Sequence, residues 1–197
     1  MNKRAFELSV SFLVILIICI AIFSFSIYIV RKFFTHAENL RMTYDERTER
    51  EIEQLLDDGS RIAIPFDKKE IGNGEFKTFG IGILNTLNIG MENKFRITVG
   101  FNKAYDKKNT EICNKMFPNK CGNPNSWLKT STGTVLPNGD VLVPKTIKNN
   151  EQEKFLIGME VKNAPAGTYI FDLNVQYETP PTYTAYDTTH KLYVDVP

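Results

Sequence analysis

Two cysteines flank a short polar loop, and they are the residues whose type and spacing best fit covalent chemistry. Cys113 and Cys121 enclose the segment CNKMFPNKC. This spacing can close a short disulfide, a bond that persists outside the cytosol. Two free thiols are the alternative. Metal binding is disfavoured, because no second cysteine pair accompanies them and His36 and His190 lie far away in the sequence.

Two tyrosines stand in a loop rich in threonine and proline, ETPPTYTAYDTT, at residues 178–189. Tyr183 and Tyr186 could stack from this loop on a partner protein of the cell envelope or on a glycan, because loops often carry binding residues and tyrosine combines an apolar ring with a polar tip. The alternative is that both tyrosines cover the end of the folded domain.

Motifs that would indicate an enzyme are missing from the chain. We find no nucleophile elbow, no zinc-binding histidine pair on a helix, no Walker loop, no dinucleotide fingerprint and no EF-hand loop. The sequence therefore predicts a protein that is not an enzyme and uses no cofactor. With 24 basic and 23 acidic residues the net charge is +1, which argues against a nucleic-acid partner.

Residues 8–30, LSVSFLVILIICIAIFSFSIYIV, contain no charged side chain. As a helix this stretch would be about 34 Å long, enough for a hydrocarbon core of about 30 Å. It is longer than the apolar region of a cleaved signal and lacks an Ala-x-Ala end, so a cleaved signal or a buried hairpin is the less favoured interpretation. The sequence predicts a cytoplasmic tip and a single membrane span over residues 1–34.

The orientation of this span is not decided by flanking charge. Lys3 and Arg4 precede it, and Arg31 and Lys32 come after it, so the positive-inside rule is nearly balanced. The expected disulfide favours a cytoplasmic amino terminus and a carboxy-terminal domain outside the cytosol. The predicted localisation is the cell membrane.

Residues 35–59 predict a short polar helix between the span and the domain. Apolar residues are sparse, and Ile52, Leu55 and Leu56 near its end could dock on the carboxy-terminal domain. A spacer that holds the domain away from the membrane is one interpretation. Self-association of these segments is the other, although the apolar stripe is shorter than a coiled coil requires.

From residue 60 onward the apolar residues alternate, and turn residues recur about every twelve positions, which is typical of an all-β sandwich. Residues 95–101, FRITVGF, and 168–177, TYIFDLNVQY, alternate most clearly. Trp127 opens a segment in the middle of the domain, where it is either a core anchor or a binding aromatic. The sequence predicts one β-sandwich domain over residues 60–197.

The segment PAGTY places Pro165, Gly167, Thr168 and Tyr169 before the strand with the longest alternation. This corner resembles the Ig-like modules of prokaryotic surface proteins, in which the tyrosine hydroxyl bonds back to the chain. The resemblance implies an Ig-like antiparallel β-sandwich of about seven strands, preceded by the long transmembrane helix and the polar stalk helix.

The amino terminus, KRAFELSVSFLVILII, is similar to those of type IV pilin-like proteins, including archaeal pilins and archaellum components. The resemblance implies processing near Lys3, Arg4 and Ala5, and assembly through the helix with a role for Glu7. In the family the glutamate generally lies fifth after the cut, whereas cutting after Arg4 or Ala5 would place Glu7 third or second. The alternative is that Lys3 and Arg4 are cytoplasmic anchors and Glu7 is an interfacial residue.

Together these features predict a membrane-anchored protein of the cell surface. Its Ig-like domain would act as a binding or structural module of the cell envelope, and the resemblances imply an archaeal source. The alternative is a pilin-like or archaellum-stator-like subunit that self-associates through its amino-terminal helix.

Overall fold

The computed structural model describes residues 12–27, 46–130, 134–135 and 141–197. The chain divides into two compact units, Met1–Arg41 and Met42–Pro197.

In the first unit, residues 12–27 form a helix whose side chains are all exposed. Its hydroxyl groups are satisfied inside the helix, since Ser24 Oγ donates to the Ile20 carbonyl and Ser26 Oγ to the Ile22 carbonyl, both at 2.8 Å. The remaining residues of the predicted 8–30 span lie outside the described residues. Within the described part of the chain, no helix is long and apolar enough to cross a membrane, so the expected long helix is not confirmed.

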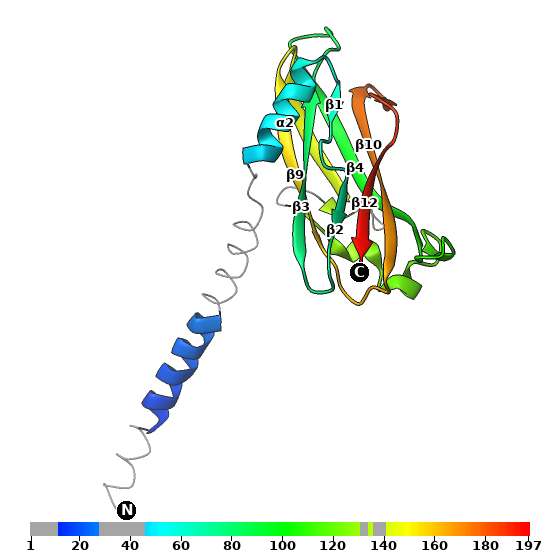
Figure 1. The fold of residues 1–197 in the computed structure, drawn as a ribbon. Helices are drawn as coiled ribbons and strands as arrows, with labels where there is room; N and C mark the ends of the chain where they lie inside the picture. Colours follow the sequence, from blue (N-terminus) through cyan, green and yellow to red (C-terminus); the bar gives the residue numbers. More distant parts are fainter. Residues whose placement is uncertain (1–11, 28–45, 131–133, 136–140) are drawn as a thin grey trace, which may run out of the picture. The chain divides into compact units, whose positions relative to one another are not determined.

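The second unit is mainly β and contains two sheets (Figure 1). The smaller sheet has the order β1-β3-β9-β6, formed by β1 (Ile62–Ala63), β3 (Phe76–Leu84), β9 (Gln152–Glu160) and β6 (Leu128–Lys129). The larger sheet has the order β2-β12-β10-β4-β8-β7, formed by β2 (Lys68–Glu70), β12 (His190–Val196), β10 (Gly167–Thr179), β4 (Glu92–Tyr105), β8 (Val141–Lys148) and β7 (Thr134–Val135). β11 (Thr182–Ala185) pairs with β10, and β5 (Glu111–Asn114) pairs with β4.

The predicted β-sandwich is confirmed, but the expected set of about seven antiparallel strands is too simple. The described residues contain twelve strands, because short edge strands flank the long ones. The sheets are also not entirely antiparallel, since β2 runs parallel to β12. Two short 3₁₀ turns, η1 (Pro118–Cys121) and η2 (Pro124–Trp127), lead into β6.

The core lies between the sheets and agrees with the alternation seen in the sequence. On β4 and β10 every second side chain points inward and is buried; these are Phe95, Ile97, Val99, Phe101, Tyr169, Phe171, Leu173 and Val175. Trp127 is fully buried, and its indole N–H donates to the Lys162 carbonyl at 3.2 Å. Trp127 is therefore a core anchor and not a binding aromatic.

The corner before β10 has the bond that the Ig-like resemblance implies. The Tyr169 hydroxyl donates to the Pro165 carbonyl at 2.8 Å. Burial raises the pKa of Tyr169 to about 12, because the charged phenolate is disfavoured away from water. Gly167 is required beside it, since a Cβ at this position would lie 2.3 Å from the Tyr105 carbonyl oxygen.

Helix α2 (Glu46–Asp57) packs on the outer face of the small sheet. Its Ile52 and Leu56 side chains are buried and Leu55 is partly buried, as their apolar character predicted. They fit against β3 because two outward positions of that strand are glycine. A Cβ at Gly80 would lie 2.6 Å from Thr48 Cγ2, and one at Gly82 would lie 2.3 Å from Ile52 Cγ2.

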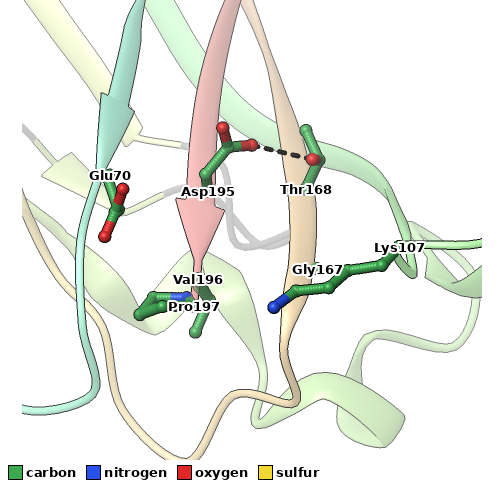
Figure 2. Close-up of a pocket in the computed structure, with 7 residues that line it drawn as sticks. All are labelled: Glu70, Lys107, Gly167, Thr168, Asp195, Val196 and Pro197. Carbon is green, nitrogen blue, oxygen red and sulfur yellow. Dashed lines mark hydrogen bonds between the residues drawn. The ribbon is translucent and has the colours of Figure 1, made fainter.

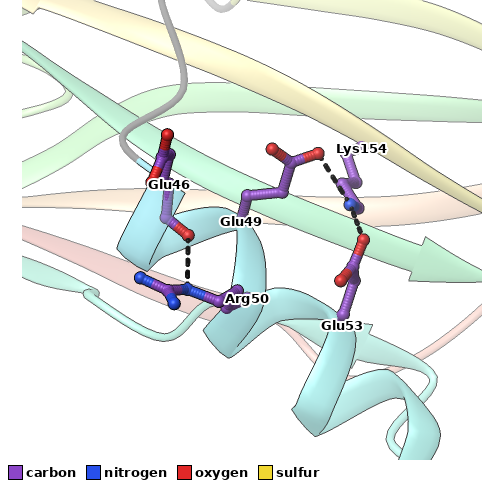
Figure 3. A network of polar contacts seen from close by, with 5 residues as sticks. All are labelled: Glu46, Glu49, Arg50, Glu53 and Lys154. Carbon is purple, nitrogen blue, oxygen red and sulfur yellow. Dashed lines mark hydrogen bonds and ion pairs between the residues drawn. The ribbon is translucent and has the colours of Figure 1, made fainter.

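A charged group also joins α2 to the small sheet. Figure 3 shows Lys154 of β9 reaching between Glu49, at 2.9 Å, and Glu53 on successive turns of the helix. Burial lowers the pKa of the Lys154 amine, but its hydrogen bonds to Glu53 and Glu49 outweigh burial and hold the pKa above its usual value. The same view shows Arg50 Nε donating to the Glu46 carbonyl at 3.3 Å.

Candidate interaction surface

Tyr183 lies on the exposed hairpin formed by β10 and β11. Two prolines, Pro180 and Pro181, connect the strands, and the hydroxyls of Thr179 and Thr184 lie 2.8 Å apart across the hairpin. Tyr183 is 39% exposed and pairs in register with Glu178, which places its side chain on the outer face of the large sheet. Tyr183 is therefore exposed to solvent, and its predicted role in binding a partner stays a prediction.

The Tyr183 ring is held by a cation on β4. The guanidinium carbon of Arg96 lies 4.0 Å from the ring centre, within the range of a cation–π contact. Arg96 is oriented by the side-chain amide oxygen of Gln176, Oε1, which accepts from Nε at 3.0 Å and also from Nη2. Beside them Lys94 pairs with Glu178 at 3.5 Å. We call this group the Tyr183 surface: Lys94, Arg96, Gln176, Glu178 and Tyr183.

This surface combines an aromatic ring with the cations Lys94 and Arg96 and the carboxylate of Glu178, which leaves a net charge of +1. The ring and guanidinium are ordered by their mutual contact, so a ligand that stacks there would not have to order them itself. Such a surface suits a sugar ring or a peptide with aromatic or amide groups. The described residues that form it include no nucleophile with an adjacent base.

Tyr186 has the opposite placement. Its side chain is 4% exposed, and its hydroxyl donates to the Leu84 carbonyl and accepts from the Thr86 amide at 3.1 Å. Its ring packs edge-on against Phe95 with the centroids 5.0 Å apart. Tyr186 therefore covers the end of the sandwich, as the alternative interpretation of this loop predicted, and only Tyr183 of the pair faces solvent.

The predicted disulfide between Cys113 and Cys121 is present in the structure, with a Cα–Cα distance of 6.2 Å. Both cysteines are buried against the core. Between them the loop exposes Met116 and Phe117, which are 81% and 59% accessible. The bond holds an apolar loop tip at the surface.

A shallow hollow of ≈ 290 Å³ lies at the end of β12, lined by Glu70, Lys107, Gly167, Thr168, Asp195, Val196 and Pro197 (Figure 2). Asp195 accepts from Thr168 Oγ1 and pairs with Lys68, both at 2.7 Å. Burial raises the pKa of the Asp195 carboxyl, but these two bonds outweigh it and hold the pKa below its usual value.

Because Asp195 already has two partners, the hollow offers mainly Lys107 and Glu70, which Figure 2 shows on opposite sides of β12. Their charges are opposite, so the hollow has no net preference for an anion or a cation. It is a weaker candidate than the Tyr183 surface.

The predicted processing and assembly residues Lys3, Arg4, Ala5 and Glu7 lie outside the described residues. Among the residues that are described, no group of three or more histidine, cysteine, aspartate or glutamate side chains could hold a metal ion.

Sequence reasoning missed Arg96 and Gln176 as parts of the surface. The alternation of FRITVGF places Arg96 on the outer face, but its partner Gln176 is 80 residues away. The pairing register of β4 with β10 brings them together, and no local pattern reveals that register. An arginine at an outward strand position is the one signal that the sequence offers.

No protein-family model matches the chain, and no curated protein matches it. Among solved structures, a PapD-like domain of human CEP192 aligns with a TM-score of 0.44 and 10% identity, over 70% of this chain and 85% of that one. The C. elegans MSP family member WR4 aligns at 0.37 and 7%, over 70% and 99%. The fimbrial subunit MyfA of Yersinia enterocolitica aligns at 0.35 and 12%, over 68% and 94%. These scores are below 0.5, so they carry no conclusion about function.

Proposed function

We propose that this protein is a single-span protein of the cell envelope. Its sandwich domain lies outside the cytosol and serves as a binding or structural module, without enzymatic activity or a cofactor. The amino terminus is cytoplasmic in this proposal. The partner is an envelope protein or a glycan that contacts the Tyr183 surface.

The observation that carries the anchoring proposal is the hydrogen bonding of the hydroxyl groups in residues 12–27. Every side chain of this helix is exposed, and nearly all are apolar. The two serines bond to carbonyls of their own helix. In a bilayer polar groups must find partners within the segment, because no water is present to supply them. The uncharged sequence over residues 8–30 supports the same proposal.

The disulfide supports the proposed side of the membrane. Thiols of cytosolic proteins are kept reduced, whereas disulfides persist in envelope and extracellular compartments. The Cys113–Cys121 bond joins residues separated by 8 positions and is buried at both ends, so it fits a stable structural crosslink.

The test is to fractionate cells that express the full chain. We expect the protein to remain in membranes after an alkaline carbonate wash, and a membrane-impermeant amine reagent to label the domain on intact cells. The double variant Ile18→Arg/Ile22→Arg should leave the membrane fraction, because each central arginine opposes insertion by about 3 kcal/mol. Its matched control is Ile18→Leu/Ile22→Leu. Release of the unaltered protein by carbonate would refute the anchoring proposal.

The second candidate is a pilin-like or archaellum-stator-like subunit that assembles through the amino-terminal helix. The apolar surface of residues 12–27 favours it as well, because identical helices could cover that surface. The intact mass of the same membrane-extracted protein separates the two. A chain that begins at Ala5 or Phe6 would indicate prepilin-type processing, and a chain that begins at Met1 or Asn2 would indicate a plain anchor.

A further inference from the structure

The outer edge of β11 is open. Among the described strands β11 pairs with β10 alone, and all four of its residues are exposed (Figure 1, orange hairpin). In an antiparallel pair, alternate residues direct both backbone polar groups to the partner strand. The Tyr186 amide donates to the Val175 carbonyl at 2.9 Å, so the same register makes Thr184 and Thr182 bond to β10. The N–H and C=O groups of Tyr183 and Ala185 therefore face outward.

The edge of β11 lacks the protection found at the edge that β2 forms in the same sheet. At the neighbouring edge, β2 has the sequence KKE, and charged residues discourage another strand from pairing. β11 has the sequence TYTA, with no charge and no proline within the strand. Its short length limits how many bonds an added strand could form.

The side chains of β11 leave its backbone accessible. The Tyr183 ring leans over β10 toward Arg96 and away from the open edge. Ala185, the other residue with outward backbone groups, carries a single methyl group. An incoming strand therefore meets backbone donors and acceptors directly.

We propose that β11 pairs in an antiparallel manner with β11 of a second copy of this chain. The two-fold axis passes at Thr184, so that Tyr183 exchanges two hydrogen bonds with the partner's Ala185, and Ala185 exchanges two with the partner's Tyr183. All the open backbone groups of both strands are then satisfied. Thr184 faces the partner's Thr184 as a pair without direct backbone bonds.

Other registers satisfy fewer groups. An axis at Tyr183 would place Ala185 opposite the partner's Pro181, which has no N–H to donate. An axis at Ala185 would place Tyr183 opposite the partner's Asp187, beyond the end of β11. The axis at Thr184 is therefore selected by the position of the hairpin turn and the length of the strand.

The same register pairs compatible side chains. The large Tyr183 stands opposite the small Ala185 of the second copy on one face, and two threonines meet on the other face. Threonine pairs across strands are favourable, and like charges directly opposite one another are not. This strand brings no charged residues together. The complementarity of TYTA with itself is the reason to infer a second copy as the occupant.

Pairing at β11 goes beyond the proposed function and does not require it. If the chain is anchored in a membrane, copies are held at a high effective concentration, which would favour the small contact that two four-residue strands can make.

Site-directed disulfide trapping tests the pairing in the full chain within membranes, with Cys19→Ser removing the free thiol of the helix. Opposed Cα atoms in such a pair lie about 4.5 Å apart, within the range that a disulfide can bridge. Thr184→Cys should therefore form a covalent dimer on mild oxidation. The two copies of residue 182 would lie about 14 Å apart, so Thr182→Cys, equally exposed on the same strand, is the control and should remain monomeric.

A charge test complements the trapping. Thr184→Lys should lower the dimer fraction of the detergent-solubilised chain several-fold in analytical ultracentrifugation, because it places two cations opposite one another, and so should Thr184→Glu. Mixing these two variants should restore dimers. Equal trapping of the two cysteine variants, or no trapping of Thr184→Cys, would overturn the proposal.

The outcome separates the two proposals. A monomeric Thr184→Cys chain that stays in carbonate-washed membranes refutes the pairing and leaves the anchoring intact. A trapped dimer that carbonate releases refutes the anchoring and supports the pairing.

Discussion

Tyr183 and Tyr186 are three residues apart in one short extended segment, and this odd spacing places their side chains on opposite faces. Tyr183 is on β11, with its side chain on the outer face. Tyr186 comes after the strand and turns inward, where its hydroxyl bonds to Leu84 and Thr86 about a hundred residues earlier in the chain. The second tyrosine thus closes one end of the sandwich.

Replacing each hydroxyl tests this difference. Tyr186→Phe should lower the free energy of unfolding by about 1–3 kcal/mol, because it leaves the Leu84 carbonyl and the Thr86 amide without this partner in a buried place. Tyr183→Phe is the matched control, and it should change the free energy of unfolding by less than about 0.5 kcal/mol, as is usual at the surface. Urea unfolding measures both. Equal effects of the two variants would contradict the assignment of the Tyr186 hydroxyl to a buried position and of the Tyr183 hydroxyl to the surface.

Asn85 is buried, although asparagine is a residue type usually found at the surface. The side chain is fully buried, donates from Nδ2 to the Ile147 carbonyl at 2.9 Å, and accepts at Oδ1 from the Leu87 amide at 3.1 Å. Its polar atoms are therefore satisfied, which makes burial tolerable. Asparagine in a turn region is expected at the surface, so no local pattern singles this residue out.

At the scale of elements, the contact between α2 and β3 depends on two positions of the strand that are glycine. Ile52 and Leu56 approach the strand closely because Gly80 and Gly82 have no Cβ. The apolar residues of the helix predicted that it would dock on the carboxy-terminal domain. The sequence did not predict that Gly80 and Gly82 receive the helix.

Gly82→Ala should therefore destabilise the domain by about 1–3 kcal/mol through overpacking, since the new Cβ would lie 2.3 Å from Ile52 Cγ2 and 2.9 Å from Leu56 Cδ1. Adding Ile52→Ala should make the double variant more stable than the sum of the single effects predicts. Gly72→Ala is the control, because its Cβ would meet the flexible Glu75 side chain at 3.3 Å. Strict additivity in urea unfolding would show that α2 does not pack on Gly82.

The disulfide and the tyrosine corner secure neighbouring connections of the sandwich. Cys113–Cys121 closes the loop after β5, and the bond from Tyr169 to Pro165 fixes the entry to β10. Both were predicted from short motifs, because each links residues that are close in the sequence. Each one orders a connection whose ends the long strands then hold in place.

At the scale of the whole molecule, the buried Tyr169 makes the free energy of unfolding depend on pH in the alkaline range. The pKa of Tyr169 is about 12 in the folded chain, against about 10 for an exposed tyrosine. Between these values the unfolded chain loses a proton that the folded chain keeps, so raising the pH favours unfolding. The stability that the protonated Tyr169 contributes is fully present below about pH 10 and is lost as the pH rises toward about 12.

The expected loss attributable to Tyr169 is at most about 2.7 kcal/mol, which corresponds to about two pKa units. Urea unfolding at a series of pH values from about 9 to about 12 measures it. Tyr169→Phe should be less stable below about pH 10, because it lacks the bond to Pro165, but its stability should fall less steeply above that pH. Parallel pH profiles for the two proteins would mean that Tyr169 titrates normally.

Local sequence patterns predicted the β-sandwich, the inward faces of β4 and β10 and a short disulfide between the two cysteines, and the Ig-like resemblance implied the corner at Tyr169. These features depend on a period of two residues along a strand or on neighbours within about eight positions, so local pattern is sufficient. The uncharged residues 8–30 likewise predict a span, which stays a prediction.

The folded structure was needed to show which tyrosine is exposed, which strand face receives α2, and that Arg96 and Gln176 support Tyr183. The folded structure also shows that, among the described strands, β11 pairs only with β10 and leaves its other edge open. These features depend on the register between strands, which is set by the combined packing of side chains 80 to 100 residues apart. A local pattern fixes which residues face inward, but it does not fix which strand lies opposite, because many pairings bury the same alternating face.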